Sequence, residues 1–168
     1  MPRIFACLSV ANALLLLATG VFGLLAARVS VDRHVLMAVL ALLMSCLVQV
    51  AAFTYLTVTG KMIAQAVFLA DLDRAVLVEV RRMKRRVTLW LPLVLGSLVL
   101  VTGTGAWLWR GGAEASFHYV SAGAVFVAHA WACRREYAVI VENSDLLTRV
   151  LNQYSSRQRT RGAVSTAT

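Results

Sequence analysis

Three histidines are the residues of this chain best suited to chemistry: His34, His118 and His129. Imidazole is the commonest metal ligand in proteins, and helical bundles build haem sites from histidines on facing helices. His34 and His118 each stand near the start of a long apolar block. If these blocks are helices that run in the same direction, the two histidines lie at similar depth. They are then candidate axial ligands of one b-type haem; the alternative is that both are hydrated and unligated at a membrane surface.

His129 lies three helical turns beyond His118, which places it roughly 16 Å deeper along a helix. At that depth an earlier apolar block offers Ser45 and Gln49 but no histidine. We therefore expect His129 to form a polar pair inside the protein, with Gln49 or with Ser45. The apolar blocks, the last of them taken to end at Cys133, contain no Asp, Glu, Lys or Arg. No carboxylate is then present to complete a metal site, and a proton-driven transporter is disfavoured.

Four apolar blocks must position these side chains. The chain is 60% apolar, which exceeds the share of a soluble domain, and the excess is gathered in runs long enough to cross a bilayer. These runs cover residues 4–27, 34–60, 87–109 and 116–137. The first run is longer than the apolar part of a secretory signal peptide, which favours a retained helix. The sequence therefore predicts an all-α membrane protein, a bundle of four transmembrane helices.

Lys and Arg are distributed unevenly between the ends of these blocks. The segment 61–86 and the C-terminal tail are basic, whereas the other two connections hold few such residues. The positive-inside rule then places both termini in the cytoplasm, and we expect the membrane to be the cytoplasmic membrane of a bacterium.

The densest basic cluster precedes the third block, where we expect it to contact anionic lipid headgroups or a partner protein. Its members are Arg81, Arg82, Lys84, Arg85 and Arg86. A net charge of +9 in a soluble protein would suggest nucleic acid. No nucleic-acid-binding motif accompanies the charge, so we do not expect that partner.

The helices are expected to continue beyond the membrane on the basic side. Between the second and third blocks there is no Gly or Pro, and apolar residues recur at steps of three and four, the spacing of one helical face. We place the turn at residues 71–73, where an aspartate can cap the returning helix. Helical extensions are predicted over 61–86 and 134–152. The tail, 155–168, is rich in Ser, Arg and Thr and is expected to be disordered.

Two segments resemble parts of small four-helix membrane proteins of bacteria. They are FTYLTVTGKMIAQAV, from Phe53 to Val67, and ACRREYAVIVENSDLL, from Ala132 to Leu147. In that family the first segment reads more like FYFIGTG and follows a histidine, whereas here Gln49 stands at the histidine's place and Thr57 at a glycine's. The resemblance implies the four-helix membrane fold and no particular activity. The change at Gln49 argues against a metal or haem site at that position.

No catalytic motif stands out in the chain. We expect a non-catalytic integral membrane protein, a structural or anchor subunit that docks through its basic cytoplasmic end, as a homo-oligomer or with a cytoplasmic protein. The alternative is an electron-transfer or quinone-reactive anchor that binds haem b through His34 and His118. A small-solute transporter is a third class, and the uncharged interior argues against it.

Overall fold

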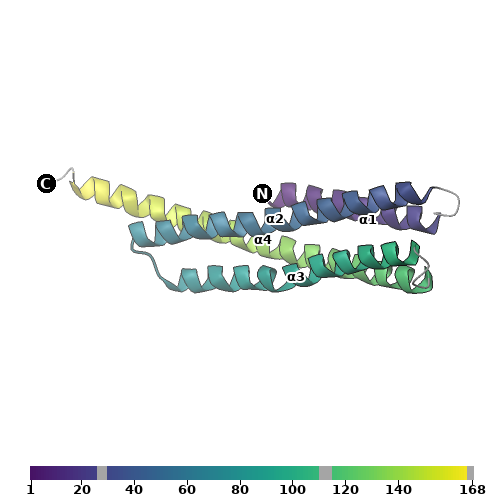
Figure 1. Cartoon of the computed structure of the whole chain (residues 1–168). Helices are drawn as coiled ribbons and strands as arrows, with labels where there is room; N and C mark the ends of the chain where they lie inside the picture. The colour runs from purple at the N-terminus through teal and green to yellow at the C-terminus, as the bar shows by residue number, and fades with distance from the viewer. Residues whose placement is uncertain (26–29, 110–114, 166–168) are drawn as a thin grey trace.

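The computed structural model describes residues 1–25, 30–109 and 115–165. Within these ranges the chain forms four helices: α1 (Pro2–Leu24), α2 (Val31–Leu69), α3 (Ala75–Trp109) and α4 (Ala115–Ser165). They pack as an elongated antiparallel bundle, in which the α1–α2 and α3–α4 connections lie at the same end (Figure 1). Because α1 is much shorter than α2, the N-terminus lies part-way along the bundle. One end therefore has four helices, and the other has only α2, α3 and α4.

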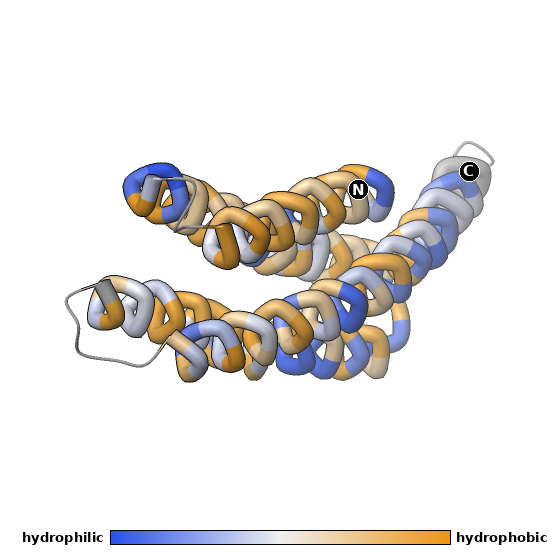
Figure 2. Tube along the Cα trace, turned by 90° about the vertical axis from the view of Figure 1, so that its right-hand side faces the viewer, coloured by the Kyte–Doolittle hydropathy of each residue, from blue (hydrophilic) through white to orange (hydrophobic). Residues whose placement is uncertain are grey.

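Among the described residues, three helices are long and apolar enough to cross a membrane: α1, α2 and α3. The fourth is long enough, but His118, Tyr119 and His129, together with serines, lower the hydropathy of its first half. The predicted all-helical architecture with four helices is confirmed, while length and composition support three spans rather than four. Residues 26 and 27 of the first expected span lie outside the described residues. Figure 2 shows apolar residues along α1 and hydrophilic ones gathered toward the three-helix end.

The three-helix end has an apolar core of its own. Ile63 of α2, Met83 of α3 and Val150 of α4 are each at most 1% exposed and belong to one cluster, to which α1 contributes nothing. Burial of a large apolar side chain stabilises a fold by about 1.5–3 kcal/mol. The three helices therefore hold one another in place beyond the level at which α1 begins.

The turn between α2 and α3 ends one helix and begins the next with local hydrogen bonds. Asp71 has a φ of 50°, and the N–H of Leu72 donates to the Val67 carbonyl at 3.0 Å. This is the Schellman pattern, with an aspartate at the left-handed position that glycine usually takes. The Asp73 carboxylate then accepts from the Ala75 N–H at 2.9 Å and caps α3, as the sequence predicts.

The C-terminal helix is longer than the composition of the tail predicts. α4 continues to Ser165, past Tyr154, where disorder is expected. A long-range contact explains part of this difference: the Arg157 guanidinium donates to the backbone carbonyls of Ala70 and Asp71 at the C-terminal end of α2. A cation at this end of a helix is favourable, because the unpaired carbonyls carry partial negative charge. Residues 166–168 of the expected tail lie outside the described residues.

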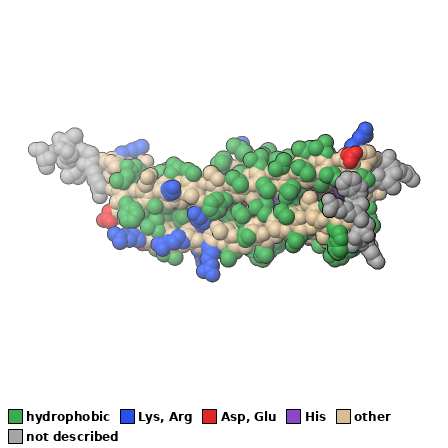
Figure 3. All heavy atoms as spheres, in the orientation of Figure 1, with side chains coloured by type: hydrophobic (Ala, Val, Ile, Leu, Met, Phe, Trp, Pro, Cys, Tyr) green, Lys and Arg blue, Asp and Glu red, His purple; other side chains and the backbone are tan. Residues whose placement is uncertain are grey.

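Charge is separated along the long axis of the molecule. On the face shown in Figure 3, apolar side chains cover the four-helix half, and most Lys and Arg side chains lie on the half toward the α2–α3 turn. A smaller charged group, Asp32 and Arg33, stands at the opposite end, at the start of α2. The apolar half is thus bounded by charge on both sides.

Candidate functional site

His34 and His118 face each other near the end of the bundle where the loops lie. Their ring centroids are 6.4 Å apart and the ring planes are nearly perpendicular, at 85°. His34 belongs to α2 and His118 to α4, two helices that run in the same direction and contact each other. Helical spacing places both at the start of their helices, and packing of α2 against α4 brings the two rings together.

A glycine makes room for each of these rings. A Cβ added at Gly23 of α1 would lie 2.9 Å from Cε1 of His34, and a Cβ at Gly105 of α3 would lie 2.9 Å from Cε1 of His118. Real Cβ atoms do not approach so closely, so each imidazole occupies a notch that only glycine leaves open. The same arrangement, a glycine of one helix against an imidazole of the next, therefore occurs in both helical hairpins, α1–α2 and α3–α4.

The nitrogen atoms of this pair are only partly satisfied. Nδ1 of His118 lies 3.3 Å from the Thr104 hydroxyl, whereas Nδ1 of His34 is buried without a hydrogen-bond partner. The neighbouring Tyr119 hydroxyl donates to the Gly23 carbonyl at 3.4 Å. Within the described part of the chain, no three His, Cys, Asp or Glu side chains come together as a metal site. The site therefore offers two imidazoles and no carboxylate.

His129 belongs to a separate polar group in the middle of the four-helix part. The Asn12 amide donates to Nε2 of His129 at 2.6 Å, and Oδ1 of Asn12 accepts from the Ser45 hydroxyl at 3.1 Å. The Cys133 sulfur lies 3.5 Å from the same imidazole nitrogen. This group joins α1, α2 and α4. The expected partners of His129 were Gln49 and Ser45, but Asn12 stands between His129 and Ser45.

Gln49 pairs with a residue that sequence reasoning missed. Its amide donates to Oε2 of Glu136 at 3.2 Å, and Glu136 is only 2% exposed. The interior is therefore not free of carboxylates, contrary to the expectation from the apolar blocks. Two arginines follow Cys133, so the apolar block is taken to end there and Glu136 is not counted as an interior residue. The available signal was its spacing of seven residues from His129, which places both on one face of α4.

A third polar pair lies in the three-helix end. The Asn143 amide donates to the Thr59 hydroxyl at 2.7 Å, and Thr59 in turn donates to the Tyr55 carbonyl of its own helix. Between these polar groups, Val48, Ala52 and Leu56 of α2 are at most 2% exposed and fill the interior. The polar groups thus form cross-links between helices at successive levels of the bundle.

The basic cluster on α3 is largely unpaired. Arg81, Arg82, Arg85 and Arg86 are exposed, and Lys84 is partly buried. Among the described residues, one member forms an ion pair: Arg86 with Glu142, at 3.1 Å. An exposed ion pair of this kind contributes little to stability, so the cluster is not explained as a structural network.

Aromatic side chains lie beside this cluster. Lys84 Nζ stands 5.1 Å from the centre of the Phe53 ring. One turn and a half further along α3, Trp90 packs edge-to-face on Trp131 of α4 at 5.0 Å, and the Arg135 guanidinium covers Trp131 at 5.0 Å. Half-exposed tryptophans next to arginines are typical of the boundary between hydrocarbon and headgroups.

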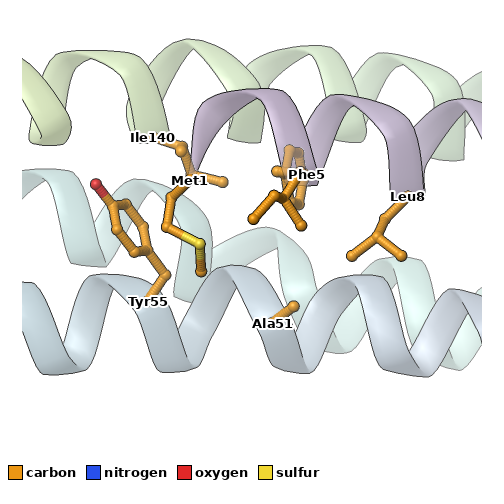
Figure 4. Close-up of a pocket in the computed structure, with 7 residues that line it drawn as sticks. Met1, Phe5, Leu8, Ala51, Tyr55 and Ile140 are labelled. Carbon is orange, nitrogen blue, oxygen red and sulfur yellow. The ribbon is translucent and has the colours of Figure 1, made fainter.

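A small apolar gap lies where α1 begins. It is surrounded by Met1, by Phe5 and Leu8 of α1, and by Ala51 and Tyr55 of α2. Ile140 of α4 closes it (Figure 4). Its volume is about 20 Å³, close to the minimum for one water, and a water needs polar partners that these walls do not provide. The gap is a packing defect and no ligand site.

No protein-family model, curated protein or solved structure matches this chain. The resemblance of residues 53–67 and 132–147 to small bacterial membrane proteins therefore stays a hypothesis.

Proposed function

We propose that this chain is an integral protein of a bacterial cytoplasmic membrane, with four spanning helices and both termini in the cytoplasm. It serves as a non-catalytic structural or anchor subunit, held by anionic lipid headgroups at its basic end. The observation that carries this proposal is the exposed and largely unpaired basic cluster of α3 beside the packed pair of Trp90 and Trp131. Each Lys or Arg near an anionic surface adds about 1 kcal/mol of attraction.

The composition of α4 is compatible with a fourth span, because its two histidines and Glu136 lie inside the bundle. His118, His129 and Glu136 are between 2% and 8% exposed, whereas Val120 and Val127 on the outer face are 73% and 66% exposed. Lipid meets only the outer face of a helix in a bundle. Mean hydropathy counts the buried polar residues as well and so underestimates how well this helix suits a bilayer.

Cysteine labelling tests the proposed topology. In a background in which Cys7, Cys46 and Cys133 are replaced by alanine, single cysteines at Ser30 and Ser156 stand at opposite ends of the molecule, and both positions are exposed. A membrane-impermeant maleimide should label position 30 in intact spheroplasts and position 156 only in inverted vesicles. Labelling of both positions from the same side would refute four spans.

Charge reversal tests the proposed lipid contact. The variant R81E/R82E/R85E leaves Arg86 and its ion pair with Glu142 in place. Native mass spectrometry of the protein in mild detergent should show at least tenfold less retained phosphatidylglycerol. The matched control R81K/R82K/R85K keeps the charge and should retain the lipid. Equal retention by both variants would overturn the proposal, and loss of a bound soluble protein with lipid unchanged would assign the surface to protein docking instead.

A second candidate function is favoured by the distance between His34 and His118. A metal held between two imidazole nitrogens, with bonds of about 2.0–2.1 Å as in zinc sites, would place the ring centroids about 6 Å apart. The observed separation is 6.4 Å, which matches this spacing, so His34 and His118 are the residues that would hold a haem b. Bound haem would supply one-electron transfer, and the protein would be an electron-carrying or quinone-reactive anchor.

A reduced-minus-oxidised absorption spectrum of the purified, haem-supplemented protein decides this candidate. A sharp α-band that disappears in His34→Ala and in His118→Ala, and persists in His129→Gln, would establish the pair as ligands. A flat spectrum from folded protein would remove haem and leave the anchor function alone.

A further inference from the structure

A cleft of about 180 Å³ opens between α1 and α4, away from the paired histidines His34 and His118. Ser9, Ala13 and Leu16 of α1 line one wall, and Phe126, His129 and Cys133 of α4 line the other. The small side chains of Ser9 and Ala13 leave this space between the two helices unfilled. The cleft is about nine times larger than the apolar gap of about 20 Å³ at the start of α1.

Nδ1 of His129, a buried atom of the lining, has no hydrogen-bond partner, and the buried hydroxyl of Ser9 has none apart from the neighbouring Cys133 sulfur. His129 is 2% exposed, and the Asn12 amide donates to its Nε2 at 2.6 Å. An amide nitrogen only donates, so Nε2 is the acceptor and the ring proton of the neutral imidazole is on Nδ1. A fixed N–H donor without an acceptor costs free energy, most of all in a bilayer, where no bulk water replaces the missing bond.

The surroundings of the cleft are apolar and uncharged. Val10 and Leu14 of α1 and Val127 of α4 are 60%, 62% and 66% exposed, so the helices present an apolar surface beside its mouth. No Asp, Glu, Lys or Arg lines it. An occupant must therefore be neutral, soluble in lipid, and able to accept a hydrogen bond.

We propose that this cleft binds the head group of a membrane-soluble quinone. A quinone is neutral and flat, and its two carbonyl oxygens are acceptors that match the N–H of His129 and the hydroxyl of Ser9. Phe126 offers an aromatic face on which such a ring packs. The isoprenoid tail leaves through the open side into the bilayer. The inference rests on the proposed insertion of α1 and α4 into a membrane, which the cysteine labelling tests separately, and does not depend on haem.

Binding is measured on the full chain in nanodiscs of synthetic phosphatidylcholine and phosphatidylglycerol that contain no quinone. The probes are a short-chain benzoquinone and a short-chain naphthoquinone, and isothermal titration is corrected by empty nanodiscs. Saturable binding of at least one probe, at one per chain, is expected. The proposal is overturned if protein that passes the labelling test gives no more heat than the empty nanodiscs. That result would leave the proposed topology unaffected.

Two phenylalanine variants on neighbouring positions of α1 separate the cleft from the general lipid surface. Ala13→Phe fills the cleft, whereas Leu14→Phe places the same ring on the lipid-exposed face. Ala13→Phe should weaken binding at least tenfold, and Leu14→Phe should leave it unchanged. If both variants bind as the wild type does, the quinone sits elsewhere and the proposal fails.

Removal of the hydrogen-bonding groups tests recognition itself. Ser9→Ala keeps the fold and should weaken binding severalfold. His129→Leu keeps the volume and should weaken binding about tenfold, and the infrared carbonyl band of the bound quinone should return toward its unbonded frequency. Native mass spectra test whether a phospholipid occupies the cleft instead. If a phospholipid stays bound to the wild type, is lost in Ala13→Phe and is not displaced by either probe, the cleft is a lipid site and the proposal is overturned.

Discussion

At the residue scale, the interior of this bundle is organised by polar side chains that each reach across to another helix. Asn12 joins three helices, because its amide group contacts His129 of α4 and Ser45 of α2. Gln49 with Glu136, and Thr59 with Asn143, join α2 to α4. In an apolar interior such bonds leave few alternative alignments, since a shift of one helix leaves polar groups unpaired.

Asn12→Leu should lower the free energy of unfolding by about 1–2 kcal/mol, because the variant leaves His129 and Ser45 without their shared partner. The control is Thr102→Val, since the Thr102 hydroxyl donates only to the Leu98 carbonyl of its own helix. The control should change stability by less than about 0.5 kcal/mol. Reversible unfolding in mixed micelles measures both. If both variants lose the same free energy of unfolding, the hydrogen bonds between helices do not contribute to stability.

Gly105→Ala should destabilise the protein and displace the His118 ring, because the added Cβ would stand 2.9 Å from its Cε1 atom. Gly103→Ala is the matched control on the same helix, since a Cβ there meets no atom within 4 Å. The control should be neutral or stabilising by up to about 1 kcal/mol, from helix propensity alone. Thermal unfolding measures the difference in stability, and the imidazole signals in NMR spectra report the displacement of His118. If the two variants behave alike, the space beside Gly105 has no role in placing the ring.

At the scale of elements, the helices differ in what holds them. α1 is mostly apolar and packs on α2 and α4. The far end of α4 is polar, and one of its arginines contacts the end of α2. Arg157 contacts the carbonyls of Ala70 and Asp71, which end α2. Arg157 thus adds a polar contact to the apolar packing of Val150 and Tyr154 that couples the C-terminal part of α4 to the α2–α3 turn.

Arg157→Ala should loosen the C-terminal part of α4, because the carbonyls at the end of α2 lose their cation. Amide hydrogen exchange over residues 150–160 should become faster by up to about tenfold, while exchange in α1 should stay the same. Arg159→Ala is the control, since Arg159 is an exposed arginine of the same helix. Unchanged exchange in Arg157→Ala would mean that α4 is helical there without the contact.

At the scale of the whole molecule, the bundle has two parts with different surfaces. The four-helix part presents apolar side chains outward (Figure 3) and buries Asn12, Ser45, Gln49 and His129. The three-helix part has an apolar core and carries most of the Lys and Arg side chains visible in Figure 3. We propose that the first lies in the bilayer and the second in the cytoplasm. The two parts should then lose structure separately when the core of only one is damaged.

Met83→Ala should cost about 2–5 kcal/mol in the three-helix part, because Met83 is 1% exposed and its truncation leaves a cavity. Hydrogen exchange should accelerate over residues 139–150 and stay slow in α1. Met62→Ala serves as the control, as Met62 of α2 is 42% exposed and should contribute less than about 0.5 kcal/mol. Simultaneous loss of protection in α1 would show that the molecule is one cooperative unit.

The sequence by itself determined where the helices form and how far along the bundle each side chain lies. Apolar runs long enough to cross a bilayer predict the helices, aspartates mark the α2–α3 turn, and the positions of His34 and His118 near the starts of their runs predict similar positions along the bundle. These features follow from local rules: the rise per residue and the chemistry of caps.

Only the tertiary structure decided which side chains meet. Periodicity places Asn12, Gln49, His129 and Glu136 on inward faces, but the lateral order and the relative shift of α1, α2 and α4 select the partners. His129 therefore pairs with Asn12, and the carboxylate beyond the apparent end of the last apolar run is buried. A distant contact likewise supports part of the extra length of α4, since Arg157 reaches residues 86 and 87 positions away. Such contacts depend on packing between helices, which no local pattern encodes.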